Sequence, residues 1–124
     1  MTAITEAIHA GAFLEAEAPG TLSRETGTVK SGEVLKAGQL VMLSGTELVA
    51  HDGALDTDGN LVTAVEGIMF DAVDASGGAV ANSVYIARLA EVKDVSLTYP
   101  TETTAGGEKD ACIASLKLLN IRPR

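Results

Sequence analysis

The chain has 124 residues, a length that fits one domain and is too short for two full domains. Hydrophobic residues make up 46% of the sequence, which is too many for a mostly disordered chain. Nine basic residues against 17 acidic ones give a formal charge of −8, so the surface repels phosphate backbones and anionic lipids. These numbers argue against nucleic-acid and membrane binding and predict a single folded domain.

The residue types that are rare in this chain exclude further kinds of protein. Aromatic residues are only 3% of the chain, so the core must be aliphatic and a stacking surface for bases or sugars is not expected. The single cysteine, Cys112, cannot form an internal disulfide, which fits a reducing compartment. No apolar run approaches the ~18 residues of a spanning helix. Residues 1–14 contain no Lys or Arg and do not resemble a secretory signal.

The N-terminal residues 1–20 differ in composition from the rest of the chain. Ala, Gly and Glu dominate them, and Pro19-Gly20 closes the stretch with a turn signal. Gly11 interrupts the helical spacing of the apolar side chains before a third turn, so an isolated helix here would be marginal. We expect residues 1–20 to form a flexible arm and residues 21–124 to form the folded domain. The alternative is a frayed terminus without a function.

Short strands separated by glycine-containing turns are predicted after residue 21. The expected strands, which are apolar or β-branched runs bounded by turn residues, are residues 26–30, 39–43, 46–50 and 80–91. Ser44-Gly45 has the composition of a hairpin turn. Residues 61–73 form a longer apolar stretch, in which Gly67 indicates a bulge or a close backbone approach.

The run at residues 80–91 looks apolar on both faces of one strand, with Asn82 and Arg88 as the exceptions. Both faces of a strand are buried only when other parts of the protein pack against each of them. Either another subunit or the core of the same domain can supply that packing.

Only the C-terminal part of the chain has a helical pattern. Apolar side chains recur at helical spacing at Cys112, Leu116 and Leu119. They predict a helix over about residues 105–119, with Thr103 or Thr104 as its N-cap and Asn120 as a left-handed C-cap. The expected fold class is therefore a mainly β small domain with one C-terminal α-helix and a flexible N-terminal arm.

No motif in the sequence indicates catalysis. His51 opens a loop and His9 lies in the expected arm, and the G-x-S-x-G pattern around a nucleophilic serine is absent. Cys112 falls on the apolar side of the predicted helix, where a cysteine is usually a small core residue. An enzyme would need His51 beside a carboxylate and a nucleophile in a cleft. We expect no catalytic residue and no cofactor.

The acidic loop at residues 51–60 resembles the start of a calcium-binding loop. Its alternating side chains are Asp56, Asp58 and Asn60. The sixth and twelfth positions of such a loop require glycine and glutamate, but Leu61 and Gly67 occupy them here. A solvated turn without a metal is therefore the better interpretation.

Short motifs spread over about residues 16–121 carry a resemblance to a known family. Residues 18–25, APGTLSRE, match an A-P-G-x-L-S segment followed by an S-R-[DE] form. Further matching segments occur in the same order: LVAHDG at 48–53, AVEGI at 64–68, FDAVDA at 70–75, ARLAEV at 87–92 and Tyr99-Pro100. The chain thereby resembles the bacteriophage head decoration proteins of the phage lambda protein D type. It departs from them at His51, in the longer loop at 56–62 and at residues 120–124.

The resemblance implies a non-enzymatic capsid protein with a β-clip type fold. Family members are made in the bacterial host cytoplasm and bind, as homotrimers, to the exterior of the expanded head, where they hold the capsid against the pressure of packaged DNA. The segment before the A-P-G motif is flexible in the free protein and pairs with strands of the coat protein on the capsid. The expected partners are thus the major capsid protein and further copies of the chain, with no nucleic acid, membrane or small-molecule substrate.

The candidate capsid-binding residues lie in the arm and directly after it. They are Phe13, Leu14, Pro19, Gly20, Leu22, Ser23, Arg24 and Glu25. We expect the apolar members to anchor the arm and residues 23–25 to fix its junction with the domain. Arg24 forms either a specific salt bridge or an ordinary surface charge. Deletion of residues 1–18 is expected to leave a folded trimer that no longer decorates heads.

A second functional class remains open from the sequence. A small ligand-binding or accessory β domain would also be compact, acidic and glycine-rich. Such a domain needs an enclosed cavity lined by polar groups and aromatic rings. The 3% aromatic content makes that cavity improbable.

Overall fold

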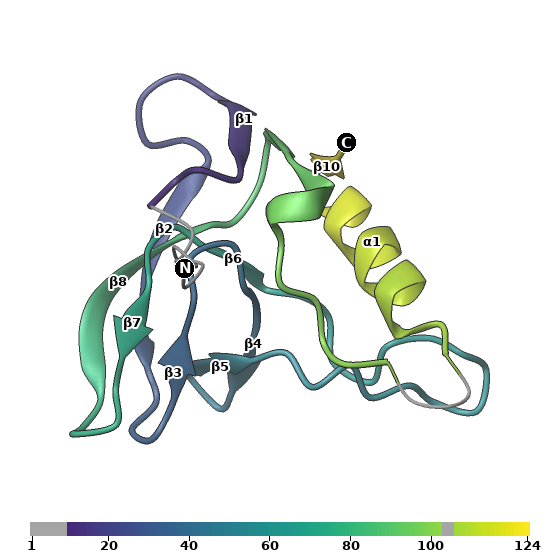
Figure 1. Cartoon of the computed structure of the whole chain (residues 1–124), viewed down its shortest axis with the longest axis horizontal. Coiled ribbons are helices and arrows are strands. Elements are labelled where there is room, and N and C mark those ends of the chain that lie inside the picture. The colour runs from purple at the N-terminus through teal and green to yellow at the C-terminus, as the bar shows by residue number, and fades with distance from the viewer. Residues whose placement is uncertain (1–9, 103–105) are drawn as a thin grey trace, which may run out of the picture.

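The computed structural model describes residues 10–102 and 106–124. Within these residues the chain forms three β-sheets, a short 3-10 helix and one α-helix near the C-terminus (Figure 1). The prediction of a mainly β domain with a single C-terminal α-helix is therefore confirmed.

The largest sheet is a closed barrel. Its strands follow the order β2 (Arg24–Val29), β5 (Glu47–Ala50), β4 (Leu40–Ser44), β6 (Gly67–Met69) and β8 (Val80–Ile86). Closure removes the free edges of this sheet, so its backbone groups pair within the chain. Strands β4 and β5 form the predicted hairpin, with Gly45 in a left-handed conformation at its turn.

Strand β6 lies unusually close to β8. A Cβ atom on Gly67 would lie 2.4 Å from the carbonyl oxygen of Ile86, so only glycine fits between the two strands. The predicted close backbone approach at Gly67 is confirmed.

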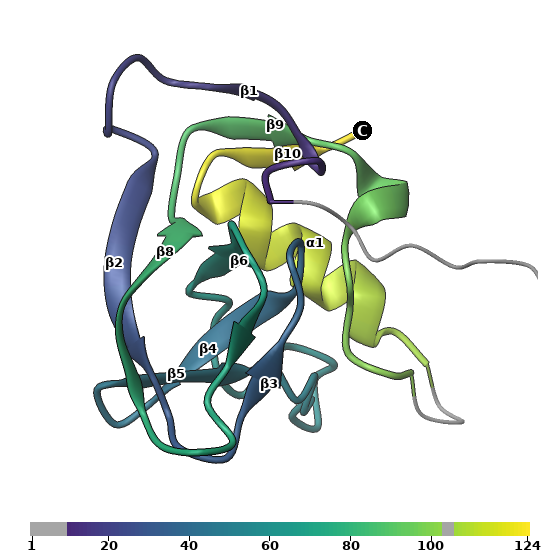
Figure 2. The same cartoon turned by 60° about the vertical axis from the view of Figure 1, so that its left-hand side comes forward.

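A second, three-stranded sheet packs on the α-helix. Its central strand β9 (Ala90–Val92) pairs antiparallel with β1 (Leu14–Glu17) and parallel with β10 (Ile121–Pro123). Figure 2 shows this sheet beside α1 (Glu108–Leu118), above the barrel. One core cluster joins the sheet, the helix and the barrel; its largest side chains are Phe13, Leu40, Ile68, Ile86, Leu116 and Ile121.

Two smaller elements complete the fold. Strands β3 (Val34–Leu35) and β7 (Val73–Asp74) form a two-stranded sheet, which contributes to a second core cluster inside the barrel. The 3-10 helix η1 (Asp94–Ser96) follows β9. The sequence patterns had not indicated β1, β3, β7, β10 or η1.

The apolar run at residues 80–91 is not one strand. Strand β8 ends at Ile86 and β9 starts at Ala90, because Leu89 adopts a left-handed φ of 53° that turns the chain out of the barrel into the second sheet. Ala81 is exposed, as is Asn82, which the prediction had already named as an exception. The prediction of one strand over residues 80–91 that is buried on both faces was therefore wrong.

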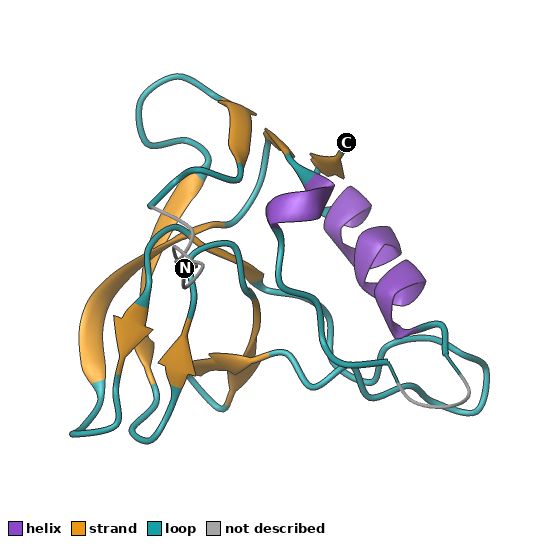
Figure 3. Cartoon of the chain, in the orientation of Figure 1, coloured by secondary structure: helices purple, strands orange, loops and turns teal. Residues whose placement is uncertain are grey.

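The C-terminal helix is shorter than the predicted span of 105–119. It begins at Glu108 after Gly107, whose φ of 94° places it in the left-handed region, whereas the expected caps Thr103 and Thr104 lie outside the described residues. Asn120 has the predicted left-handed conformation, with a φ of 59°. The helix is drawn in purple in Figure 3.

Candidate functional site

The described part of the expected arm packs against the domain. Phe13 is fully buried in the core that joins the second sheet to the barrel. Its carbonyl oxygen accepts a hydrogen bond of 2.7 Å from the backbone N–H of Lys93. Strand β1 then pairs with β9, with Leu14 opposite Val92. Residues 14–17, which the sequence had placed in the arm, therefore lie in a sheet of the domain, because the apolar ring before them finds space in the core.

The chain enters this packed segment at Gly11. The Gly11 N–H donates to the carbonyl oxygen of Phe70 at 2.9 Å, and the Gly11 carbonyl accepts from the N–H of Leu14 at 3.0 Å. Gly11 has a φ of 69°, and a Cβ atom there would lie 2.8 Å from the Phe70 ring. A tight turn at Gly11 thus precedes the packed residues 13–17.

Ser23 joins two connections that are distant in the sequence. Its side chain is fully buried; the Oγ donates to the Leu89 carbonyl at 2.8 Å and accepts from the Ala18 N–H at 2.9 Å. The Ser23 carbonyl also accepts a hydrogen bond from Ala87. One buried hydroxyl therefore holds the β1–β2 connection against the β8–β9 connection.

Arg24 forms a specific ion pair. Its guanidinium donates two hydrogen bonds to the carboxylate of Glu17 and lies 4.3 Å from the centre of the Phe70 ring. Of the two alternatives that the sequence left open, the structure contains the salt bridge. A two-bond Arg–carboxylate pair restricts the geometry of both side chains.

The remaining candidates lie on the surface. Glu25 pairs with Arg88, whose Nη1 also donates to the Leu22 carbonyl at 2.6 Å. The Leu22 side chain is 60% exposed, and Pro19 and Gly20 are exposed in the same connection. The candidates thus divide into buried or paired residues that hold the β1–β2 connection and exposed residues at its tip.

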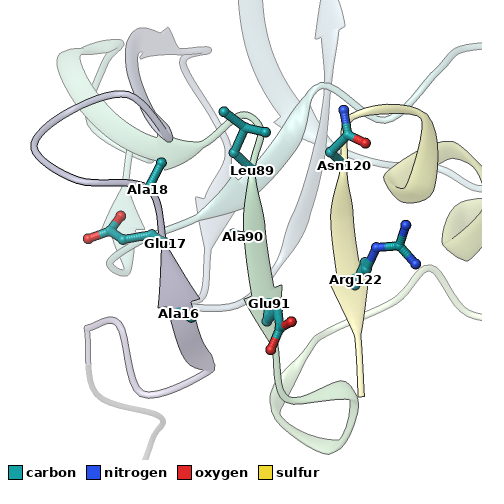
Figure 4. Close-up of a pocket in the computed structure, with 8 residues that line it drawn as sticks. All are labelled: Ala16, Glu17, Ala18, Leu89, Ala90, Glu91, Asn120 and Arg122. Atoms are coloured by element: carbon teal, nitrogen blue, oxygen red, sulfur yellow. The ribbon is translucent and has the colours of Figure 1, made fainter.

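An open hollow of about 370 Å³ lies on the second sheet, next to this connection. Figure 4 shows alanines from β1, its following turn and β9 along it, with longer side chains around them. The surrounding residues are Glu17, Leu89, Glu91, Asn120 and Arg122. Leu89 and Arg122 were not predicted from the sequence, because no local pattern signals a left-handed leucine or the pairing of β10 with β9.

The two residues considered for catalysis have structural roles. His51 is buried; its Nδ1 accepts a hydrogen bond from the Gly53 N–H and its Nε2 donates to the Thr63 carbonyl, at 2.9 and 2.8 Å. Cys112 is fully buried, and burial raises the pKa of its thiol to about 11. A neutral, buried thiol is a poor nucleophile.

The acidic loop is a hydrogen-bonded turn. The Oδ1 atom of Asp56 accepts hydrogen bonds from the N–H groups of Asp58 and Asn60. This is the local capping that aspartate provides in turns. Across residues 10–102 and 106–124, no three His, Cys, Asp or Glu side chains are grouped as metal ligands. No helix in this part of the chain is long and apolar enough to span a membrane.

Comparison with protein families identifies the chain. Residues 3–121 match the family model of the bacteriophage lambda head decoration protein D. The chain belongs to this family. No curated protein matches it. Family membership makes the chain a structural protein of the virion, which decorates and stabilises the phage capsid from its exterior and is not an enzyme.

Proposed function

We propose that the chain decorates the capsid as a homotrimer, in which residues 1–10 of each copy bind the major capsid protein. We call residues 1–10 the N-terminal segment. The observation that carries this proposal is the firm attachment at Gly11 and Phe13, because the segment can transmit force to the domain only through a fixed base. The formal charge of −8 further supports a protein partner over nucleic acid or membrane.

The composition of the N-terminal segment suits strand pairing with the capsid protein. Its sequence, MTAITEAIHA, contains four β-branched residues and a single formal charge, on Glu6. An extended segment of this kind gains main-chain hydrogen bonds when it adds to an exposed sheet edge, and needs no preformed pocket.

Trimer formation compensates for the cost of ordering the segment. Fixing the backbone costs roughly 1–2 kcal/mol per residue, so one segment would hold weakly. Three linked segments that bind together raise the avidity by about 10²–10⁴. A trimeric clamp of this kind would hold neighbouring capsid subunits together when DNA fills the head.

The eight candidate residues divide between two roles in this proposal. Phe13, Leu14, Ser23, Arg24 and Glu25 hold the base of the segment to the domain, and the exposed Pro19 and Gly20 contact the capsid. The Leu22 side chain is exposed beside them and is not assigned to the capsid contact. The rival function as a ligand-binding domain lacks support, since the hollow on the second sheet is open and no aromatic ring lines it.

The test compares the full chain with a deletion of residues 1–9. The expected deletion to residue 18 is unsuitable because it would remove the buried Phe13 and the strand β1. We expect the shorter deletion to keep the thermal stability and the trimeric mass in light scattering, but to lose co-sedimentation with undecorated expanded heads. A variant with a Gly/Ser sequence in place of residues 1–9 controls for length. Equal binding by the deletion variant would show that the segment is not the capsid contact.

A further inference from the structure

Three leucines from separate segments are exposed at the end of the molecule that carries the second sheet. Leu22, Leu89 and Leu118 are 60%, 46% and 85% exposed. Hydrogen bonds hold their segments together, because Arg88 donates to the Leu22 carbonyl and the Leu89 N–H donates to the carbonyl of Leu119. We call these three side chains the leucine patch. Exposed leucines on segments that hydrogen bonds join, in a chain with a formal charge of −8, indicate an interface.

Leu89 is held outward by a strained backbone. Its φ of 53° is unusual for a bulky side chain, which normally avoids the left-handed region. Three hydrogen bonds enforce it: from the Leu89 N–H to Leu119, from Ser23 Oγ to the Leu89 carbonyl, and from the Ala90 N–H to Asn120. A strained residue that its surroundings fix so completely indicates a functional position.

The surface around the leucine patch is nearly neutral. Three hollows adjoin the patch: the one on the second sheet, one that contains Tyr85 and Leu118, and one that contains Asp110 and Leu118. The charged side chains that line them or pair with their lining are Glu17, Glu25, Glu66, Glu91, Asp110, Arg24, Arg88, Arg122 and Arg124. These five acidic and four basic residues leave a net charge of −1, so −7 of the formal charge of −8 belongs to the rest of the chain.

We propose that the leucine patch and the hollow on the second sheet form the contact surface for a second copy of this chain. Two acidic molecules repel each other over most of their surface, and this nearly neutral face is where two copies can approach. Within residues 10–102 and 106–124, Arg122 forms no ion pair and can bind a carboxylate of the neighbouring copy. The inference rests on the proposed homotrimer and names the surface that builds it.

The decisive variant is Leu89→Asn. Asparagine tolerates the left-handed backbone, so the substitution removes the apolar side chain without disturbing the turn. We expect it to weaken self-association by about tenfold or more, measured by light scattering across a dilution series. Leu118→Asn should weaken self-association as well, whereas Leu89→Met, which keeps an apolar side chain, should leave self-association unchanged. Val34→Asn is the matched control, because Val34 is an apolar residue that is also exposed, at 62%, on the distant strand β3.

The outcomes separate this inference from the proposed function. If the full chain forms trimers that decorate heads and both asparagine variants assemble like the Val34 control, the leucine patch is not the contact surface. If Leu89→Asn stays trimeric but no longer binds heads, the patch belongs to the capsid protein and the inference is overturned. A full chain that does not bind heads contradicts the proposed function directly, without any variant.

Discussion

The guanidinium of Arg24 holds the carboxylate of Glu17 through two hydrogen bonds, from Nε to Oε2 at 3.0 Å and from Nη2 to Oε1 at 2.7 Å. Glu17 is the last residue of β1 and Arg24 is the first residue of β2. The ion pair therefore closes the connection between the second sheet and the barrel, at the base of the N-terminal segment.

This ion pair predicts a pH-dependent contribution to stability. The hydrogen bonds from Arg24 lower the pKa of the Glu17 carboxyl in the folded state. The contribution is therefore present above the unfolded pKa of about 4.3 and is lost as the pH falls through the folded value. We expect Glu17→Gln to reduce the free energy of unfolding by about 0.5–1 kcal/mol at neutral pH, because the pair is partly exposed. The difference should shrink below about pH 4.

Urea unfolding at a series of pH values checks this prediction. Glu15→Gln is the control, because Glu15 is exposed on the same strand β1 and forms no ion pair in the described part of the chain. Parallel pH profiles for Glu17→Gln and the wild-type chain would show that the pair contributes nothing.

Truncation of the Phe13 side chain is expected to destabilise the domain strongly. The ring is fully buried between the second sheet and the barrel, so Phe13→Ala leaves a cavity. We expect the free energy of unfolding to fall by about 3–5 kcal/mol in chemical denaturation. Leu22→Ala, at an exposed side chain, should change it by less than about 0.5 kcal/mol in the monomer. Equal effects of the two substitutions would mean that Phe13 is outside the core in solution.

The barrel has no space for a side chain at Gly67. An alanine Cβ at this position would lie 2.4 Å from the Ile86 carbonyl oxygen, so β6 would have to move away from β8. We expect Gly67→Ala to cost about 1–3 kcal/mol or more in thermal or chemical unfolding. Gly77→Ala is the control, since no heavy atom lies within 4 Å of a Cβ there. A neutral Gly67→Ala variant would contradict the close approach of the strands.

The two tyrosines of the folded protein are expected to ionise at a higher pH than tyrosines of the unfolded chain. Burial, assisted by Glu66, raises the pKa of Tyr85 to about 12. Burial and a hydrogen bond to Asp94 also raise the pKa of Tyr99. Since the folded pKa values exceed the unfolded value of about 10, these residues stabilise the fold below that pH and stop doing so as the pH rises through the folded values.

Tyrosinate absorbance measures this effect directly, because Tyr85 and Tyr99 are the only tyrosines in the sequence. At about pH 11 we expect little tyrosinate in the folded protein and a strong signal in the urea-unfolded protein. Circular dichroism of the same sample shows that the fold persists. Full ionisation of a folded sample at that pH would place both rings in solvent.

Local patterns in the sequence predicted the parts of the fold that depend on neighbouring residues. The β4–β5 hairpin follows from an apolar run and a glycine turn, and the C-terminal helix follows from the spacing of Cys112 and Leu116. The close approach at Gly67 was also predicted, because a glycine within a strand has few other reasons to occur. The order of several short motifs was sufficient to indicate the family.

The role of the eight candidate residues in capsid binding stays a prediction. The structure shows that Ser23, Arg24 and Glu25 all bond to side chains or backbone from other segments. The burial of Phe13 and the outward position of Leu89 were not predicted. Both depend on which distant segments meet, and a single sequence carries no local signal for such pairing.

The amino-acid sequence by itself determined the class of this protein: a small acidic β domain of the head decoration family, without catalytic or metal-binding motifs. Only the tertiary structure decided that Phe13 and β1 pack into the domain and that Leu89 is exposed in a left-handed turn. Those features arise when β1, β9 and β10 come together from the start, the middle and the end of the chain. Hydrophobic periodicity acts over a few residues, whereas this sheet is held by hydrogen bonds and a buried ring that join residues far apart in the sequence.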